Sequence, residues 1–69
     1  MKTLDELRDD ELIDDLNLIV GRSVRYRHCP KVIRFIKNNY DRYINELEQR
    51  GMPHTAEYYK QEWNRKVEQ

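Results

Sequence analysis

Residues 30–51, PKVIRFIKNNYDRYINELEQRG, contain the strongest structural pattern in the chain. Their apolar side chains recur at intervals of three and four residues, at Ile33, Ile36, Tyr40, Tyr43 and Leu47, with Val32 and Ile44 beside them. This spacing places them on one face of an α-helix. Pro30 suits the first helical position, where an N–H is not needed, and Gly51 suits a C-terminal cap. We therefore predict a helix over about residues 30–50.

The preceding stretch shows a second helical pattern. Its apolar residues are Leu12, Ile13, Leu16, Ile19 and Val20. Thr3 and Glu6 have the spacing of a capping box, and Gly21 is placed as a C-cap. We predict a helix over about residues 4–20 and leave open a break near Arg8, with the first residues forming a separate turn. For residues 22–29 we predict a loop or a short helical turn.

A third pattern ends the chain. Ala56, Tyr59, Trp63 and Val67 share one helical face after Thr55, a plausible N-cap, so we predict a helix over about residues 55–67. The connection 51–54 is short enough for the second and third helices to form an antiparallel hairpin. The expected architecture is all-α, a single domain over residues 1–69 with three short helices.

Length and composition indicate a thin core. The chain has 69 residues and 38% of them are charged. Chains near this length bury only about 60% of their unfolded surface. The single cysteine, Cys29, excludes an internal disulfide, and small scaffolds without such links often oligomerise. We therefore predict a homodimer.

Charge is unevenly distributed along the chain. The first twenty residues contain two basic and seven acidic side chains, whereas residues 21–50 contain eight basic and three acidic ones. The total is nevertheless zero. Each region attracts opposite charge, which its own other half, a second copy or a different partner can supply.

The candidate binding residues follow from this distribution. The partner-binding candidates are Arg22, Arg25, Tyr26, Arg27, Lys31, Arg34 and Tyr58. The candidate acidic surface is Asp10, Glu11, Asp14 and Asp15. Tyr58 is included because it neighbours Tyr59 on a predicted helix, so that both can hardly point inward. The basic segment 22–37 could alternatively contact nucleic-acid phosphates, with aromatic residues stacking on bases, although the net charge of zero disfavours this.

Reactive side chains are few. His28, Cys29 and His54 lack the spacing of a zinc site, and no glycine-rich phosphate loop occurs. We expect no catalytic residue, no metal and no cofactor, and hence a protein that is not an enzyme. No signal-peptide-like or membrane-spanning apolar run occurs, so the expected location is cytoplasmic, without membrane contact.

In its short length, high charge and three-helix pattern, the chain resembles the small accessory proteins that bacteriophages and related mobile elements make to bind a host factor. The resemblance covers overall character and no individual motif, so it assigns no residue. It implies a regulatory or accessory protein that acts through protein–protein interaction.

Overall fold

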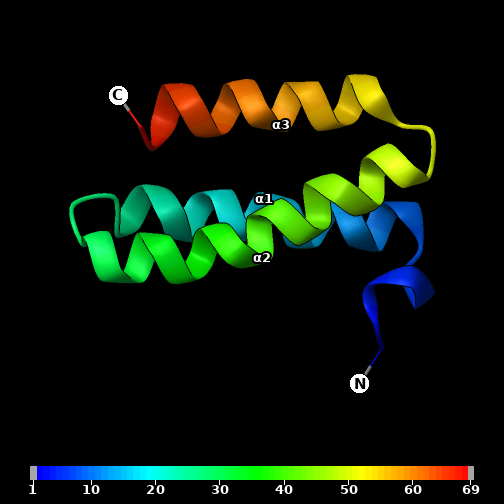
Figure 1. The fold of residues 1–69 in the computed structure, drawn as a ribbon, viewed down its shortest axis with the longest axis horizontal. Helices are drawn as coiled ribbons and strands as arrows, with labels where there is room; N and C mark the ends of the chain where they lie inside the picture. The colour runs from blue at the N-terminus through cyan, green and yellow to red at the C-terminus, as the bar shows by residue number, and fades with distance from the viewer. Residues whose placement is uncertain (1, 69) are drawn as a thin grey trace.

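Three α-helices and one short 3₁₀ turn make up the fold, and the computed structural model describes residues 2–68. The elements are η1 (Leu4–Glu6), α1 (Asp9–Arg25), α2 (Pro30–Gln49) and α3 (Pro53–Lys66). No strand occurs among the described residues, which confirms the all-α prediction. Figure 1 shows the α1–α2 connection at one end of the molecule and the α2–α3 connection at the other.

The break near Arg8 is present. Leu4–Glu6 form a separate turn, and α1 begins at Asp9. The backbone N–H of Arg8 donates to Glu11 Oε1 at 3.0 Å, and this bond lowers the pKa of Glu11. The carboxylates of the first turn also face the positive end of the helix dipole. Thr3 makes no cap to the backbone, and its hydroxyl donates to Glu6 Oε1 at 3.1 Å instead. The predicted capping box at Thr3 was therefore wrong.

α1 continues five residues beyond its predicted end, and Gly21 lies inside the helix. The residue Ser23 explains the continuation, because it extends the buried face formed by Leu16 and Val20. Its hydroxyl donates to the Ile19 carbonyl at 2.8 Å, which satisfies the buried oxygen. The predicted C-cap at Gly21 was therefore wrong, and the loop or short helical turn predicted over residues 22–29 is corrected to helix as far as Arg25.

The boundaries of α2 and α3 differ less from the prediction. Gly51 has φ 76°, as expected for a C-terminal cap. The N–H of Met52 donates to the Leu47 carbonyl at 3.0 Å and the N–H of Gly51 to the Glu48 carbonyl at 3.1 Å, which is a Schellman motif. α3 then begins at Pro53, so the predicted N-cap at Thr55 was wrong.

The core lies between the three helices. Its buried apolar residues are Leu12, Leu16, Val20, Tyr40, Ile44, Leu47, Ala56, Tyr59, Trp63 and Val67. Tyr40 donates to the Tyr59 carbonyl at 3.3 Å, and Tyr59 donates to Asn17 Oδ1 at 2.8 Å. Burial raises the pKa of Tyr40 to about 12. The beginning of the α2 stripe is less covered, and Val32 is exposed.

Two ion pairs connect α2 with the last part of the chain. Lys37, early in α2, lies 3.4 Å from Glu68, and Glu48, late in α2, lies 3.1 Å from Lys60. Earlier residues of α2 are therefore paired with later residues of the α3 region, and Figure 1 shows the chain returning along α2 after the second connection.

Candidate functional site

A cluster of five cations, here called the basic corner, forms where α1 meets α2. It consists of Arg22, Arg25, Arg27, Lys31 and Arg34, all exposed. These residues belong to the end of α1, the connection and the start of α2, so they lie at the end of the molecule away from the N-terminus (Figure 1). Within residues 2–68, none of the five has a carboxylate within 4.0 Å.

The remaining basic residues are mostly paired. Seven of the other eight lie within 4.0 Å of a carboxylate, and these are Lys2, Arg8, Lys37, Arg50, Lys60, Arg65 and Lys66. The eighth, Arg42, has no such partner in the described part of the chain. The basic corner therefore holds most of the uncompensated positive charge of the fold.

The predicted acidic surface is compensated locally. Asp10 lies 3.4 Å from Arg8, and Glu11 lies 3.5 Å from both Lys2 and Arg8. Asp15 accepts a hydrogen bond from the Tyr43 hydroxyl at 3.0 Å. These contacts leave one acidic residue of the set unpaired.

That residue is Asp14, which is exposed and has neither an ion pair nor a hydrogen bond among residues 2–68. The acidic residue of α1 that does pair with an arginine beyond α1 is Asp9, which lies 2.8 Å from Arg50, the residue that follows α2. The interpretation that the basic segment neutralises the acidic helix within one chain is thus not supported by any described ion pair.

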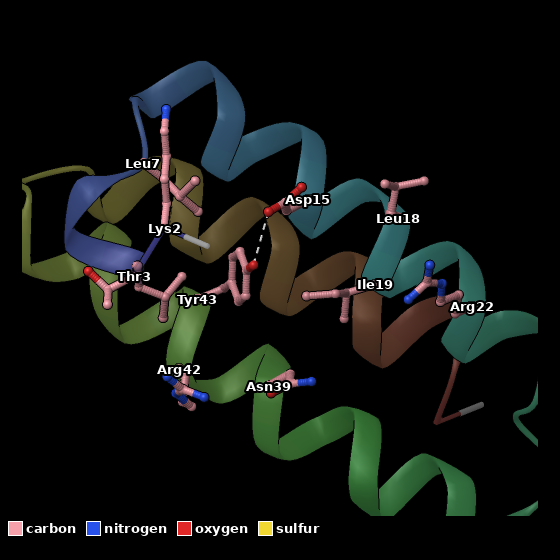
Figure 2. A pocket seen from close by; sticks show the side chains of 11 residues that line it. Lys2, Thr3, Leu7, Asp15, Leu18, Ile19, Arg22, Asn39, Arg42 and Tyr43 are labelled. Atoms are coloured by element: carbon pink, nitrogen blue, oxygen red, sulfur yellow. Dashed lines mark hydrogen bonds between the residues drawn. The ribbon is translucent and has the colours of Figure 1, made fainter.

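A groove of about 650 Å³ runs between α1 and α2, on a side to which α3 contributes no lining residue. α1 supplies Leu18, Ile19 and Arg22, α2 supplies Asn39, Arg42 and Tyr43, and the N-terminal segment supplies Leu4 and Leu7. Figure 2 shows the Tyr43–Asp15 hydrogen bond crossing between the two helices, with Leu18 and Arg22 farther along α1. We call this surface the open face.

Two large apolar side chains protrude beside this groove. Leu18 is 60% exposed and Phe35 is 73% exposed. Phe35 precedes Asn39 by four residues and Arg42 by seven, so it extends the α2 side of the open face toward the basic corner. Val32 and Tyr26 are also exposed near that end.

Neither Leu18 nor Phe35 was among the predicted binding residues, because both lie off the apolar stripes that identify the helices. Their position off the stripes was the signal in the sequence that these side chains are exposed, because an apolar residue on the polar side of a helix does not face the core. Exposed apolar residues that gather in one place often mark an interaction surface.

Tyr58 is exposed, as predicted, and packs edge-on against Tyr59 with ring centroids 5.0 Å apart. It lines a hollow with residues of α1 and α3, among them Asn17 and Glu62. Tyr58 therefore lies outside the open face, and the structure does not join it to the basic corner.

The reactive side chains are separated. Cys29 is exposed at the N-cap of α2, and His54 lies in the first turn of α3. The twenty residues of α2 lie between them, and such a helix spans about 30 Å. A thiol–imidazole pair between these residues does not form. Among residues 2–68, no three His, Cys, Asp or Glu side chains are grouped as metal ligands would be.

None of the described helices combines the length and apolarity needed to cross a bilayer. Comparison with known proteins found no matching family model, no matching curated protein and no matching solved structure.

Proposed function

We propose that this protein acts by binding another protein, without catalysing a reaction, and that the basic corner and the open face form its binding surface. The observation that carries this proposal is the group of five exposed, unpaired cations beside the exposed side chain of Phe35. Elsewhere on the described surface nearly every basic residue has a carboxylate nearby. A surface that retains both unpaired charge and apolar area is suited to a partner that supplies acidic and apolar groups.

The two features contribute differently to binding. Apolar anchors such as Phe35 and Leu18 gain free energy when a partner removes them from water, and aromatic residues and arginines are frequent at interface hot spots. The cations of the corner increase the rate of encounter with an acidic partner and favour it over basic ones. Together they support a regulatory or accessory protein that recognises an acidic, partly apolar surface.

Nucleic-acid binding is the alternative, and the cluster of arginines with the exposed Tyr26 and His28 favours it. Two observations weigh against it. Asp14 is unpaired and lies on the same helix as Arg22, where it would repel phosphates. The chain as a whole carries no net charge, whereas nucleic-acid-binding domains are commonly basic.

Several finer expectations belong to this proposal. They are an antiparallel hairpin of α2 and α3, a homodimeric state and a cytoplasmic location. The order of the ion pairs between α2 and the α3 region supports the hairpin. The resemblance to bacteriophage and mobile-element accessory proteins remains a hypothesis about origin.

The proposal is tested by affinity capture from the native host, followed by a titration with the purified captured protein. Arg25→Glu with Arg27→Glu should abolish capture. The matched control, Lys60→Glu with Arg65→Glu, changes the net charge equally away from the corner and should retain capture. Loss of binding in both variants, with both folded, would contradict the assigned surface.

A titration with arbitrary duplex DNA separates the alternative function. Phosphate contacts release counterions, so nucleic-acid binding should be strong at low salt and weaken steeply as salt rises. We expect no binding even at low salt. Tight, salt-sensitive binding that Arg25→Glu removes would favour the nucleic-acid function instead.

A further inference from the structure

The outward side of α1 carries a row of residues whose charges reverse about its centre. Glu11, Asp14, Leu18, Arg22 and Arg25 follow one another at intervals of three, four, four and three residues. Because α1 is continuous over Asp9–Arg25, this spacing places all five along one side of the helix. Two acidic residues precede Leu18 and two arginines follow it. We call this set the α1 row.

The α1 row is available for contact. Leu18 at its centre is 60% exposed. Asp14, Arg22 and Arg25 are exposed and have no ion pair among residues 2–68. Glu11 is the partly engaged member, since it lies 3.5 Å from Lys2 and from Arg8. Leu18 and Arg22 also line the open face, so the α1 row forms one edge of that surface (Figure 2).

We propose that the partner of this surface is a second copy of the chain, bound so that the two α1 helices cross antiparallel with their Leu18 side chains together. The inference rests on the proposed binding function and names its partner. Asp14 and Arg22 are each four residues from Leu18, and Glu11 and Arg25 are each seven residues from it. In the antiparallel arrangement Asp14 of each copy therefore faces Arg22 of the other, and Glu11 faces Arg25.

A two-fold dimer makes each of these contacts twice, because both copies use the same surface. Leu18 supplies apolar area at the centre of the contact, and the charged pairs lie on either side. A parallel arrangement would instead place like charges opposite one another. The net charge of zero removes long-range repulsion between the two copies.

Other occupants fit the α1 row less well. A polyanion or an anionic membrane would meet Asp14 and Glu11 together with the arginines. A purely acidic protein segment would leave Asp14 unsatisfied. A second copy satisfies both halves of the α1 row, and Asp14, unpaired within its own chain, gains a partner.

Charge reversal tests this arrangement by sedimentation equilibrium over a range of protein concentrations. The wild-type chain should approach twice its mass of 8.6 kDa. Asp14→Arg alone and Arg22→Asp alone place like charges opposite each other and should each weaken dimerisation at least about tenfold, the change that roughly 1.4 kcal/mol produces. An equimolar mixture of the two variants should dimerise again, because each copy then presents the complement of the other.

The double variant Asp14→Arg with Arg22→Asp should also dimerise alone, since its charges are exchanged at both positions. Asp41→Arg is the matched control: Asp41 is exposed on α2, has no ion pair among residues 2–68 and undergoes the same change of charge. This control should leave the dimer intact. Circular dichroism of each variant verifies that the helices are retained.

Several results would overturn the inference. They are a wild-type chain that stays monomeric at high micromolar concentration, a dimer unaffected by both single reversals, or a mixture that remains monomeric. A monomer that still captures a host protein through Arg25 and Arg27 would overturn the second copy as partner and leave the proposed binding function standing. A wild-type chain that forms the dimer and captures no host protein would leave the second copy as the partner of this surface.

Discussion

The phenol ring of Tyr40 in α2 stacks on the indole of Trp63 in α3, with ring centroids 4.4 Å apart and planes inclined by 27°. Both side chains are buried, and the Tyr40 hydroxyl reaches the Tyr59 carbonyl in the same helix as Trp63. This contact joins two helices through one aromatic pair at the centre of a small core. Changes to it should therefore be measurable in the stability of the whole fold.

Alkaline pH should destabilise the protein through this pair. The pKa of Tyr40 is raised from 10.0 to about 12, first because the phenol is buried. Since the folded state holds the neutral phenol, stability is full below pH 10 and declines as the pH rises from about 10 to about 12. Burial also raises the pKa values of Tyr43 and Tyr59, which adds to the decline. Phenolate absorbance and helical circular dichroism should change together.

Tyr40→Phe provides the control for that titration. It keeps the ring stack and removes the ionisable hydroxyl, so unfolding should shift to higher pH. At neutral pH the lost hydrogen bond should cost about 0.5–1.5 kcal/mol. Ionisation of all tyrosines near pH 10 with the helices intact would show that Tyr40 is not protected as described.

The two glycines should respond oppositely to alanine. Gly21 lies inside α1 at an exposed position, and an added Cβ would meet nothing within 4 Å. Gly21→Ala should stabilise the protein by about 0.4–1 kcal/mol, because alanine loses less backbone entropy in a helix. Gly51→Ala should destabilise it by about 1 kcal/mol, because Gly51 has φ 76°. Urea unfolding compares the two, and a loss of stability in Gly21→Ala would contradict the helical assignment of that position.

Arg50 fixes the N-terminal turn against the end of α2. Its guanidinium donates to Asp9 at 2.8 Å, to the Leu4 carbonyl at 2.9 Å and to Glu46 at 2.9 Å. Arg50→Ala should lower the melting temperature and increase proteolysis around η1, whereas Arg42→Ala, at an arginine without an ion pair in the described chain, should do neither. Arg50→Lys should restore little, because an ammonium group cannot form the same planar set of bonds. Equal behaviour of Arg42→Ala and Arg50→Ala would contradict this role.

Truncation of the two large aromatic residues should separate folding from binding. Trp63 is 3% exposed and Phe35 is 73% exposed. Trp63→Ala should cost about 3–5 kcal/mol, because it opens a cavity in the core. Phe35→Ala should change the stability of the dilute monomer by no more than about 0.5 kcal/mol, as is usual for exposed positions. It should nevertheless weaken partner binding. A large loss of monomer stability in Phe35→Ala would show that this ring belongs to the core.

Periodicity located the helices because burying one face requires apolar residues every three or four positions. The stripe from Leu12 to Val20, the turn at Gly51 and the face from Ala56 to Val67 are consequences of such local rules. The same rules placed the end of α1 wrongly at Gly21. A glycine permits a helix to end but does not require it, and Ser23 could be buried only because the Ile19 carbonyl accepted its hydroxyl.

The candidate surface, too, could be predicted from the sequence only in part. The basic cluster was visible in the sequence as five cations within thirteen residues. These cations remain unpaired because the nearby carboxylates have other partners. Asp9 forms an ion pair with Arg50, and Asp15 accepts a hydrogen bond from Tyr43. The exposure of Phe35 likewise depended on which side of α2 the other helices cover.

The amino-acid sequence by itself determined that the chain is helical, approximately where its helices lie, and that its charge is divided into an acidic and a basic region. These properties follow from neighbours three or four residues apart. Only the tertiary structure decided which charges are satisfied and which apolar side chains stay in water, because both depend on contacts between residues distant in the chain. Leu18 and Phe35 stay exposed because no other helix covers their sides of α1 and α2, and they supply apolar area to the surface proposed to bind.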